Sequence, residues 1–329
     1  MVGDIGGTNA RFALVVSGKS KLTNIKTLQC RKFETIQDAI NSYLSSIDNV
    51  QIESASIATA GTTHLDVFTL ANNNWTINKA NVSIALNNIE VKWINDFSAQ
   101  ALATTSLTND DVIILNKGII QHDRVKLVIG PGTGLGTCGL IKSAERWVPL
   151  PAQGGHSTFA PNSSLEIEIL TILKKQFGHV SVERVLSGGG IINLYKALCQ
   201  IKAKEPLFNT PAEISSAATQ SKPDQVAKDT LQLFCQIFGS VTGTIALTTG
   251  CLGGIYITSD LVRNFLDFFL ESDFLDSFQD KGRLDYYMTD IPICTDDQFQ
   301  TLFFYIPHAG HKLVHKGIFL LKPLFISRT

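Results

Sequence analysis

The sequence predicts an α/β protein made of two related lobes. Three observations support this prediction: a length of 329 residues, an alternation of apolar strands with helical segments, and a glycine turn that occurs twice. A single hydrophobic core stops growing at roughly 250 to 300 residues, so a chain of this length is expected to form two domains. Alternating strands and helices are typical of α/β folds.

The first glycine turn stands in the opening segment MVGDIGGTNARFAL. An apolar stretch over 11–16 follows it, so the opening is predicted as strand, turn, strand. A Walker loop or a dinucleotide-binding fingerprint would lead from its glycines into a helix, and the spacing of both motifs is missing. By itself, the turn suits either a phosphate site or a tight connection between buried strands.

The next elements continue the α/β pattern. We expect a helix over 36–46 and buried strands over 55–61 and 91–97. A second glycine turn follows in KLVIGPGTGLGTCGLI, where Gly132-Thr133 stands 125 residues after Gly7-Thr8. The repeat predicts an internal duplication. Two lobes that each present one glycine hairpin to a shared cleft would hold a polyphosphate through backbone N–H groups.

The rest of the chain is predicted to be mostly helical, with one more strand. Ser163 and Glu166 form a capping-box pattern for a helix that runs to about Phe177 and stops at Gly178. A long helix is expected over 225–247. A strand over 253–257 and a helix over 261–270 follow.

Asp96 is the first candidate for chemistry because it stands at the end of an apolar strand, after Asn95. Strand carboxyl ends face the ligand crevice in α/β sheets. In the functional interpretation, Asp96 accepts the proton of a substrate hydroxyl that attacks a γ-phosphate, and Asn95 holds the neighbouring hydroxyl. The alternative is that Asp96 is a helix N-cap for the segment that begins near Ser98.

A second group of polar residues lies further along the chain, in LPAQGGHSTFAP and VSVERVLSGGG. Gln153, His156 and Glu183 offer amide, imidazole and carboxylate groups, which suit hydrogen bonding to several hydroxyls of a sugar ring. Each also has a structural alternative. A lone histidine is often structural, and Glu183 is also explained as a first-turn acid favoured by the helix dipole.

Composition excludes several other classes of function. A net charge of −1 and a pI near 6.6 give no basic field, so we expect neither nucleic acid nor a membrane as partner. The six cysteines are scattered without a C-x-x-C pair, which disfavours a zinc site and a disulfide framework. Asp4 interrupts the amino terminus before any apolar run, so we expect no signal peptide and a cytoplasmic location.

These residues carry a resemblance to a known family. GDIGGTNARFAL, INDF, GPGTGLG, QGGH with FAPNS, and VSVERVLSGGGIINLY, in this order, resemble the bacterial glucokinase family of the hexokinase/actin-like ATPase fold. The resemblance covers residues 1 to about 290. It implies a duplicated ribonuclease H-like fold with a central cleft, and ATP-dependent phosphorylation of glucose at its 6-hydroxyl, the entry to glycolysis.

The resemblance also implies roles for individual residues. Asp96 would be the catalytic base, and glucose would be bound by Asn95, Gln153, His156 and Glu183. The ATP phosphates would be bound by Asp4, Gly6, Gly7, Thr8 and Asn9 in the first turn, and by Gly132, Thr133 and Gly134 in the second. Mg²⁺ would accompany ATP near Asp4.

The resemblance implies the organisation of the chain as well. We expect a homodimer, in which a small domain over 1–106 is completed by segment 298–329 and a large domain spans 107–297. The related sugar kinases with a structural zinc are excluded, because Ser157-Thr158-Phe159 follows His156 where they have a cysteine-rich motif.

Three departures from the family pattern leave alternatives open. Gln153 replaces a glutamate, Ser259 and Asp260 replace a glycine pair, and the match ends at about residue 295. If those glycines have positive φ, side chains there cost about 1 to 2 kcal/mol each, and Asp260 would repel a triphosphate. The alternatives to a glucokinase are therefore a kinase for another hexose or phosphoryl donor, and a non-catalytic sugar-binding sensor.

Overall fold

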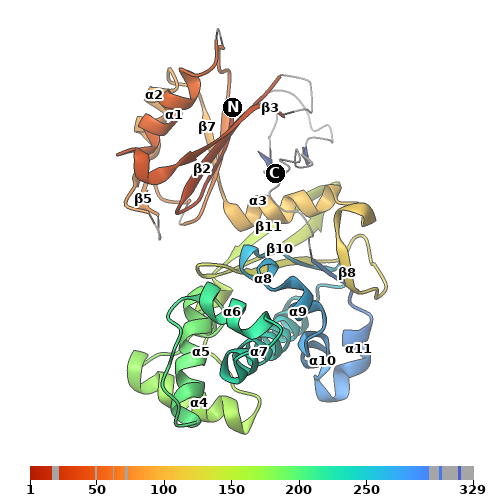
Figure 1. The fold of residues 1–329 in the computed structure, drawn as a ribbon. Helices are drawn as coiled ribbons and strands as arrows, with labels where there is room; N and C mark the ends of the chain where they lie inside the picture. Colours follow the sequence, from red (N-terminus) through yellow and green to blue (C-terminus); the bar gives the residue numbers. More distant parts are fainter. Residues whose placement is uncertain are drawn as a thin grey trace. The chain divides into compact units, whose positions relative to one another are not determined.

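The structure, a computed structural model, divides the chain into two compact units. The first comprises Met1–Thr108 and Gln298–Thr329, and the second comprises Asn109–Asp297 (Figure 1). The structure describes residues 1–16, 22–48, 50–61, 63–70 and 73–295, together with the short strands at 304–305 and 318–319. The predicted segment 298–329 lies outside the described residues apart from those two strands.

The first unit is built on a five-stranded sheet of order β3-β2-β1-β4-β7. β2 is antiparallel to both β1 and β3, whereas β1, β4 and β7 are parallel. The strands are β1 (Val2–Ile5), β2 (Asn9–Val15), β3 (Leu22–Gln29), β4 (Ala55–Thr59) and β7 (Val91–Asn95). A separate hairpin is formed by β5 (Val67–Thr69) and β6 (Thr76–Asn78), and β14 (Phe304–Tyr305) pairs with β15 (Ile318–Phe319).

Helices pack on this sheet, and apolar side chains form a hydrophobic core within the first unit. Thr35 starts α1 through a capping box with Asp38, and the ring of Tyr43 on that helix lies 5.3 Å from the ring of Phe12. Both rings are fully buried. The helices of the unit are α1 (Ile36–Leu44), α2 (Lys79–Ala85) and α3 (Asp96–Ala103), with short 3₁₀ turns η1 (Cys30–Lys32), η2 (Thr104–Ser106) and, at the start of the second unit, η3 (Asn109–Asp111).

The second unit contains a six-stranded sheet of order β11-β10-β9-β12-β13-β8. β10 is antiparallel to both β9 and β11, and β9, β12 and β13 are parallel. β8 is added at the edge, antiparallel to β13. The strands are β8 (Ile113–Asn116), β9 (Lys126–Pro131), β10 (Leu135–Ser143), β11 (Arg146–Ala152), β12 (Ile255–Ile257) and β13 (Ile293–Thr295).

The two sheets repeat one topology. Strands β9, β10, β11, β12 and β13 have the same order and the same directions as β1, β2, β3, β4 and β7. Each glycine turn connects the first two of these five strands. The predicted duplication is confirmed, and this repeated sheet is the ribonuclease H-like arrangement of the actin-like ATPases.

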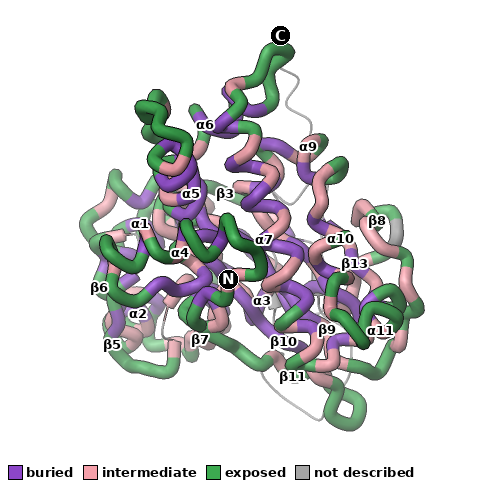
Figure 2. Tube along the Cα trace, turned by 90° about the horizontal axis from the view of Figure 1, so that it is seen from below, coloured by how far each residue is buried: buried purple, intermediate pink, exposed green. Residues whose placement is uncertain are grey.

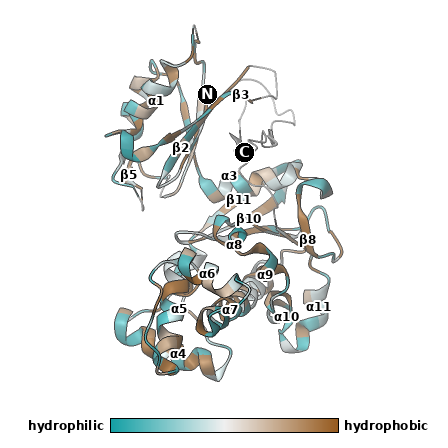
Figure 3. Cartoon of the chain, in the orientation of Figure 1, coloured by the Kyte–Doolittle hydropathy of each residue, from teal (hydrophilic) through white to brown (hydrophobic). Residues whose placement is uncertain are grey.

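Helices α5, α6 and α10 pack against α7, the longest helix of the second unit. Figure 2 shows buried segments along α5 and α7, and Figure 3 shows α4 alternating between hydrophobic and hydrophilic residues. The helices are α4 (Ser164–Phe177), α5 (Gly188–Ile201), α6 (Pro211–Thr219), α7 (Gln225–Thr249), α8 (Asp260–Arg263), α9 (Leu266–Leu270), α10 (Phe274–Gln279) and α11 (Asp285–Thr289). The 3₁₀ turns are η4 (Gly154–His156), η5 (Val182–Arg184) and η6 (Gly282–Leu284).

Among the described residues, α7 is the one helix whose length and composition would allow it to cross a membrane. However, 61% of the most apolar 18-residue stretch of α7 is buried inside the protein. Phe238 on α7 packs against Phe269 and Phe274, with ring centroids 6.0 and 5.1 Å away. The apolar composition of α7 is therefore explained by its place in the core of the second unit.

Several predicted elements need correction. The single helix expected over 261–270 is two helices, because the backbone leaves helical geometry at Phe265 (φ −140°, ψ 40°), whose ring is buried edge-on against Phe234. The expectation of one further strand after the second glycine turn missed β11 and β13, and no strand was predicted at β8, which precedes that turn. β13 has only three residues, and Pro149 and Pro151 interrupt the pattern of β11. All six cysteines are free, and five of them are buried.

Candidate active site

The first glycine turn is closed by backbone hydrogen bonds. The N–H of Gly6 donates to the carbonyl of Asn9 at 2.9 Å, and the N–H of Cys30 donates to the carbonyl of Thr8 at 2.9 Å. Neither Gly6 nor Gly7 has a positive φ. A Cβ on Gly6 would lie 3.5 Å from its nearest neighbour, which is an ordinary contact. The backbone therefore tolerates a side chain at Gly6, and the bare surface of the turn is left for a ligand.

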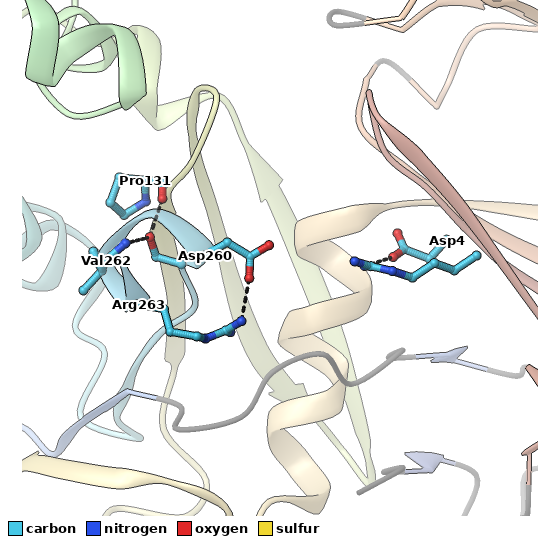
Figure 4. Close-up of polar contacts among 7 residues, drawn as sticks. Asp4, Pro131, Asp260, Val262 and Arg263 are labelled. Carbon is cyan, nitrogen blue, oxygen red and sulfur yellow. Dashed lines mark hydrogen bonds and ion pairs between the residues drawn. The ribbon is translucent and has the colours of Figure 1, made fainter. Parts of the chain in front are cut away.

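Asp4 lies one strand position before this turn and is paired with Arg11. The two residues are opposite each other in the β1–β2 register, and Arg11 Nη1 lies 3.1 Å from Asp4 Oδ2 (Figure 4). Both side chains are partly exposed. Arg11 is not one of the predicted site residues. A hairpin centred on Gly7 and Thr8 places positions 4 and 11 opposite each other. The pairing of Asp4 with Arg11 can therefore be deduced from the sequence.

Asn95, not Asp96, is the N-cap of the helix that follows β7. Asn95 Oδ1 accepts the N–H of Ser98 at 3.2 Å, and α3 begins at Asp96. The alternative interpretation of Asp96 as an N-cap is therefore wrong. Asn95 takes that place because an amide oxygen at the last strand residue reaches the N3 N–H of the helix.

The carboxylate of Asp96 is held by one of its two oxygens. Asp96 Oδ1 accepts hydrogen bonds from Asn95 Nδ2 and from the N–H of Phe97, both at 2.9 Å. Oδ2 has no hydrogen bond to any residue that the structure describes. One oxygen thus fixes the orientation of the group, and the other remains able to accept a proton.

Burial raises the pKa of Asp96 from 3.8 to about 6, and the negative charge of Asp4 adds to this shift. The effect of Asp4 indicates that the two carboxylates are near each other. β1, β4 and β7 are parallel, so their carboxyl ends lie at one edge of the sheet. The first turn, Asp4 and Asn95-Asp96 are therefore brought to that edge.

The second glycine turn, in the other unit, is also fixed by backbone hydrogen bonds. The N–H of Gly132 donates to the carbonyl of Gly134 at 2.7 Å, and the carbonyl of Gly132 accepts the N–H of Gly188 at 2.8 Å. A Cβ on Gly132 would meet no atom within 4 Å. The surface at Gly132 is therefore open, as the approach of a phosphate to the backbone requires.

Glu183 lies against the second turn. Its Oε2 accepts the N–H of Leu135 at 2.9 Å, and a Cβ on Gly134 would lie only 2.4 Å from this oxygen. Gly134 is thus a glycine because the carboxylate occupies the space of a side chain. The predicted sugar residue Glu183 and the predicted phosphate turn are in direct contact, which sequence reasoning did not anticipate.

The loop that carries Gln153 and His156 packs on the same strand. The N–H of Gly154 donates to Thr137 Oγ1 at 3.2 Å, and a Cβ on Gly155 would lie 2.5 Å from the carbonyl of Leu135. The loop continues to Ser157, whose carbonyl accepts the N–H of Val182 at 2.8 Å, immediately before Glu183. Gln153 and His156 are exposed. The structure therefore gathers Gln153, His156, Glu183 and the second turn into one cluster.

Ser259 and Asp260 do not have the strained backbone that their replacement of a glycine pair suggested. Ser259 is extended (φ −156°, ψ 110°), and no positive φ occurs at either position. Ser259 Oγ donates to the carbonyl of Pro131 and accepts the N–H of Val262 at 3.0 Å (Figure 4). The charge of Asp260 is offset by Arg263, whose Nη1 lies 2.8 Å from Asp260 Oδ1. The expected cost of left-handed φ is absent.

The comparison with known proteins identifies the family. The family model described as Glucokinase matches residues 1–297 of the chain. The chain belongs to the glucokinase family. The match to the family model ends at residue 297, close to residue 295, where the motif pattern also ends.

Individual members of the family support this assignment. The glucokinase of Hahella chejuensis is 43% identical over 293 residues, which cover 89% of this chain and 91% of the relative. The glucokinase of Photorhabdus laumondii is 36% identical over 324 residues, or 98% and 97% of the two chains. The crystal structure of a glucokinase from an Antarctic psychrotroph is 32% identical with a TM-score of 0.80, and the match covers 90% of this chain and 94% of that chain.

A more distant structure shares the fold alone. It is the ROK family glucokinase of Streptomyces griseus in complex with glucose and AMPPNP, 19% identical with a TM-score of 0.55. The match covers 84% of this chain and 88% of that one.

The donor set of the candidate site suits a magnesium ion held through a nucleotide. Within the described part of the chain, no group of three or more His, Cys, Asp or Glu side chains could hold a metal ion. Mg²⁺ usually takes only one or two protein carboxylates and completes its shell with phosphates and water. Asp4 offers carboxylate oxygens beside the first turn, so the residues present fit this mode of binding.

Proposed function

We propose that this protein transfers the γ-phosphate of ATP to the 6-hydroxyl of D-glucose, giving glucose 6-phosphate and ADP. As a member of the glucokinase family, the protein is an ATP-dependent hexose kinase. The observation that carries the proposal is Asp96. It is a carboxylate at the ligand edge of the first sheet, with one oxygen held and a pKa of about 6.

In the proposed reaction, Asp96 Oδ2 accepts the proton of the sugar 6-hydroxyl. The sugar oxygen forms a bond to the γ-phosphorus while the bond from phosphorus to the β,γ-bridging oxygen breaks, and ADP leaves with that electron pair. At neutral pH a group with a pKa near 6 is ionised, yet it is basic enough to take the proton. General base catalysis of this kind contributes about 10² to 10⁴ in rate.

The sugar would be bound by Asn95, Gln153, His156 and Glu183. One hydrogen of Asn95 Nδ2 is used on Asp96, so the second is available for the hydroxyl next to the reacting one. Oε1 of Glu183 is the acceptor that its bond to Leu135 leaves for the sugar. The exposure of Gln153 and His156 supports a role in ligand binding, because neither side chain is needed for the core.

The phosphates of ATP would be bound by backbone N–H groups of the two glycine turns. The first turn comprises Gly6, Gly7, Thr8 and Asn9, and the second comprises Gly132, Thr133 and Gly134. Asp4 would hold the Mg²⁺ of the Mg–ATP complex, through water or directly. When bound, the ion neutralises charge on the phosphates.

We also propose that the protein is a cytoplasmic homodimer. Six free cysteines, five of them buried, are compatible with a reducing compartment. The proposal of a dimer rests on the family resemblance. Light scattering of the purified protein at several concentrations tests it.

A coupled assay with purified protein, glucose and Mg–ATP tests the activity. We expect glucose 6-phosphate to form, and a folded protein that forms none at saturating substrate would refute the proposal. A second candidate, a kinase for another hexose or donor, is favoured by Gln153, since an amide there replaces a charged acceptor. A panel of hexoses, amino sugars, nucleotides and polyphosphate separates the two, and a clear preference for glucose and ATP eliminates the second.

The third alternative, a non-catalytic sugar sensor, has two motives: the replacement of a glycine pair by Ser259 and Asp260, and the departure from the family pattern after about residue 295. The relaxed backbone at Ser259 and Asp260 and the pairing of Asp260 with Arg263 remove the first motive. The second motive concerns residues that lie, apart from two short strands, outside the described part of the chain. Calorimetric titration with ATP is the direct test, because measurable nucleotide binding together with turnover rejects a sensor.

A further inference from the structure

The second glycine turn begins at a strand pair whose outward-facing backbone groups are bound by side chains. Pro131 and Leu135 are the last partners of the β9–β10 ladder, and they form a non-hydrogen-bonded pair, because the next bond of the ladder runs from the N–H of Gly132 to the carbonyl of Gly134. The backbone groups of such a pair face away from the partner strand, and here two side chains from distant segments bind them. Ser259 Oγ donates to the carbonyl of Pro131, and Glu183 Oε2 accepts the N–H of Leu135 at 2.9 Å.

The hydroxyl of Ser259 is fixed from its other side. As the N-cap of α8, its oxygen accepts the N–H of Val262 at 3.0 Å, so its single hydrogen is directed to Pro131 (Figure 4). The hydroxyl therefore links the base of the second turn to the first turn of α8.

Close backbone packing strengthens this link. The N–H of Thr258 donates to the carbonyl of Ile129 at 3.0 Å, and a Cβ on Gly130 would lie 1.7 Å from the carbonyl oxygen of Thr258. No side chain fits between the two segments. The end of β9 and the segment 258–259 are thus held tightly together. The hydrogen bond from Ser259 to Pro131 is the last contact between them before the turn.

At the tip of the turn, two backbone donors remain. The N–H of Gly132 donates to Gly134 and its carbonyl accepts from Gly188. The N–H groups of Thr133 and Gly134 have no hydrogen-bond acceptor among the residues that the structure describes. Thr133 is exposed, and the space beside Gly132 is open. These two N–H groups are therefore available for the oxygens of an anion.

We infer that Ser259 is a positioning residue for the phosphoryl donor, an inference that rests on the proposed kinase function. Its hydroxyl holds Pro131 so that the N–H groups of Thr133 and Gly134 are aimed before ATP arrives. A glycine-rich turn loses much conformational freedom when it is ordered, and a turn that is already fixed avoids this loss on binding. Ser259 acts on the nucleotide through the backbone of the turn.

Ser259 should affect the nucleotide and leave the sugar unaffected. It contacts Pro131 and Val262, whereas the predicted sugar residues Gln153, His156 and Glu183 are held by β10 and η5. The inference therefore predicts a change in the KM for ATP without a matching change in glucose binding.

The variants Ser259→Ala and Ser259→Thr test this inference. We expect Ser259→Ala to raise the KM for ATP about three- to tenfold, the effect of one lost hydrogen bond, while the Kd for glucose changes by less than twofold. Ser259→Thr keeps the hydroxyl and should restore the wild-type KM. If Ser259→Ala fails to fold, Ser259→Gly removes the same hydroxyl and is well tolerated as an N-cap.

Two measurements separate the positioning role from a merely structural one. Ser163→Ala removes an equivalent serine N-cap from α4, where Ser163 Oγ accepts the N–H of Glu166 at 3.2 Å, and should leave the KM for ATP unchanged. Hydrogen exchange of a peptide covering 127–140 should accelerate in unliganded Ser259→Ala and stay slow in Ser259→Thr. Unchanged exchange, or an equal rise of the KM for ATP in Ser163→Ala, would refute the inference. An inactive wild-type protein that still shows the exchange difference would refute only the proposed function.

Discussion

Asn95 Nδ2 donates a hydrogen bond to Asp96 Oδ1 over 2.9 Å, while Asn95 Oδ1 accepts the N–H of Ser98. One side chain thus begins a helix and orients the neighbouring carboxylate. Because Asp96 Oδ1 also accepts the N–H of Phe97, the direction of Oδ2 is set by the backbone at the start of α3. The arrangement is what a preorganised base needs, since its geometry does not depend on a mobile partner.

Asp96→Asn is expected to lower kcat by about 10² to 10⁴ and to leave the Kd for glucose within a few-fold of wild type. The amide oxygen can still accept from Asn95 and Phe97, but the group no longer accepts a proton. Steady-state kinetics and calorimetry with glucose measure the two effects. Asp66→Asn, at an exposed acid of the same unit, is the matched control. A fully active Asp96→Asn variant would rule out the proposed base.

The raised pKa of Asp96 predicts an acidic limb in the pH profile of kcat/KM. Below a pH of about 6 the carboxylate is protonated, so the rate should fall about tenfold for each further pH unit. Asp4→Asn removes the like charge that raises this pKa, and it should move the limb to lower pH in whatever activity remains. A limb caused by ionisation of ATP would stay in place, which would count against this assignment.

The same pKa predicts that Asp96 destabilises the folded protein at neutral pH. Its folded pKa of about 6 exceeds its ordinary value of 3.8, so between these values the folded state binds more protons than the unfolded state. Stability contributed by this group is therefore present at low pH and is lost as pH rises through about 6. Asp96→Asn should raise the free energy of unfolding at pH 7.5 by about 1 to 3 kcal/mol.

Calorimetric melting of both proteins between pH 4 and 8 measures this difference. The gain should shrink steadily as the pH falls from 6 towards 4. A stabilisation that is the same at both ends of the range would instead reflect packing or the helix terminus, and it would contradict a pKa raised by burial.

Gly132→Ala and Gly134→Ala form a matched pair at the second turn. A methyl group on Gly132 meets no protein atom within 4 Å, so this variant should fold normally and raise only the KM for ATP. A methyl group on Gly134 lies 2.4 Å from Glu183 Oε2 and must displace that carboxylate. Gly134→Ala should therefore weaken both glucose and ATP binding, with a moderate effect on stability because a side-chain end can move. Equal effects of the two variants on glucose binding would contradict the contact between Glu183 and the turn.

The sequence determined the architecture through patterns that act locally. Each glycine turn joins two apolar strands, and the repetition of the turn predicts the duplicated sheet. The limits of α4 followed from Ser163 at its start and Gly178 at its end, where the structure has an N-cap and a φ of 70°. These features depend on neighbouring residues in the chain, so they can be deduced from short stretches.

The contacts around the candidate site were decided only by the tertiary structure. Glu183 and Leu135 are 48 positions apart, and Ser259 and Pro131 are 128 positions apart, yet each pair shares a hydrogen bond. No local periodicity encodes such contacts, because they depend on how η5 packs against β10 and how β12 aligns with β9. For the same reason the sequence suggested strain at Ser259, whereas the extended backbone there makes it a helix cap. The chain thus specifies its turns and strands locally, and the alignment of distant segments decides what each polar side chain binds.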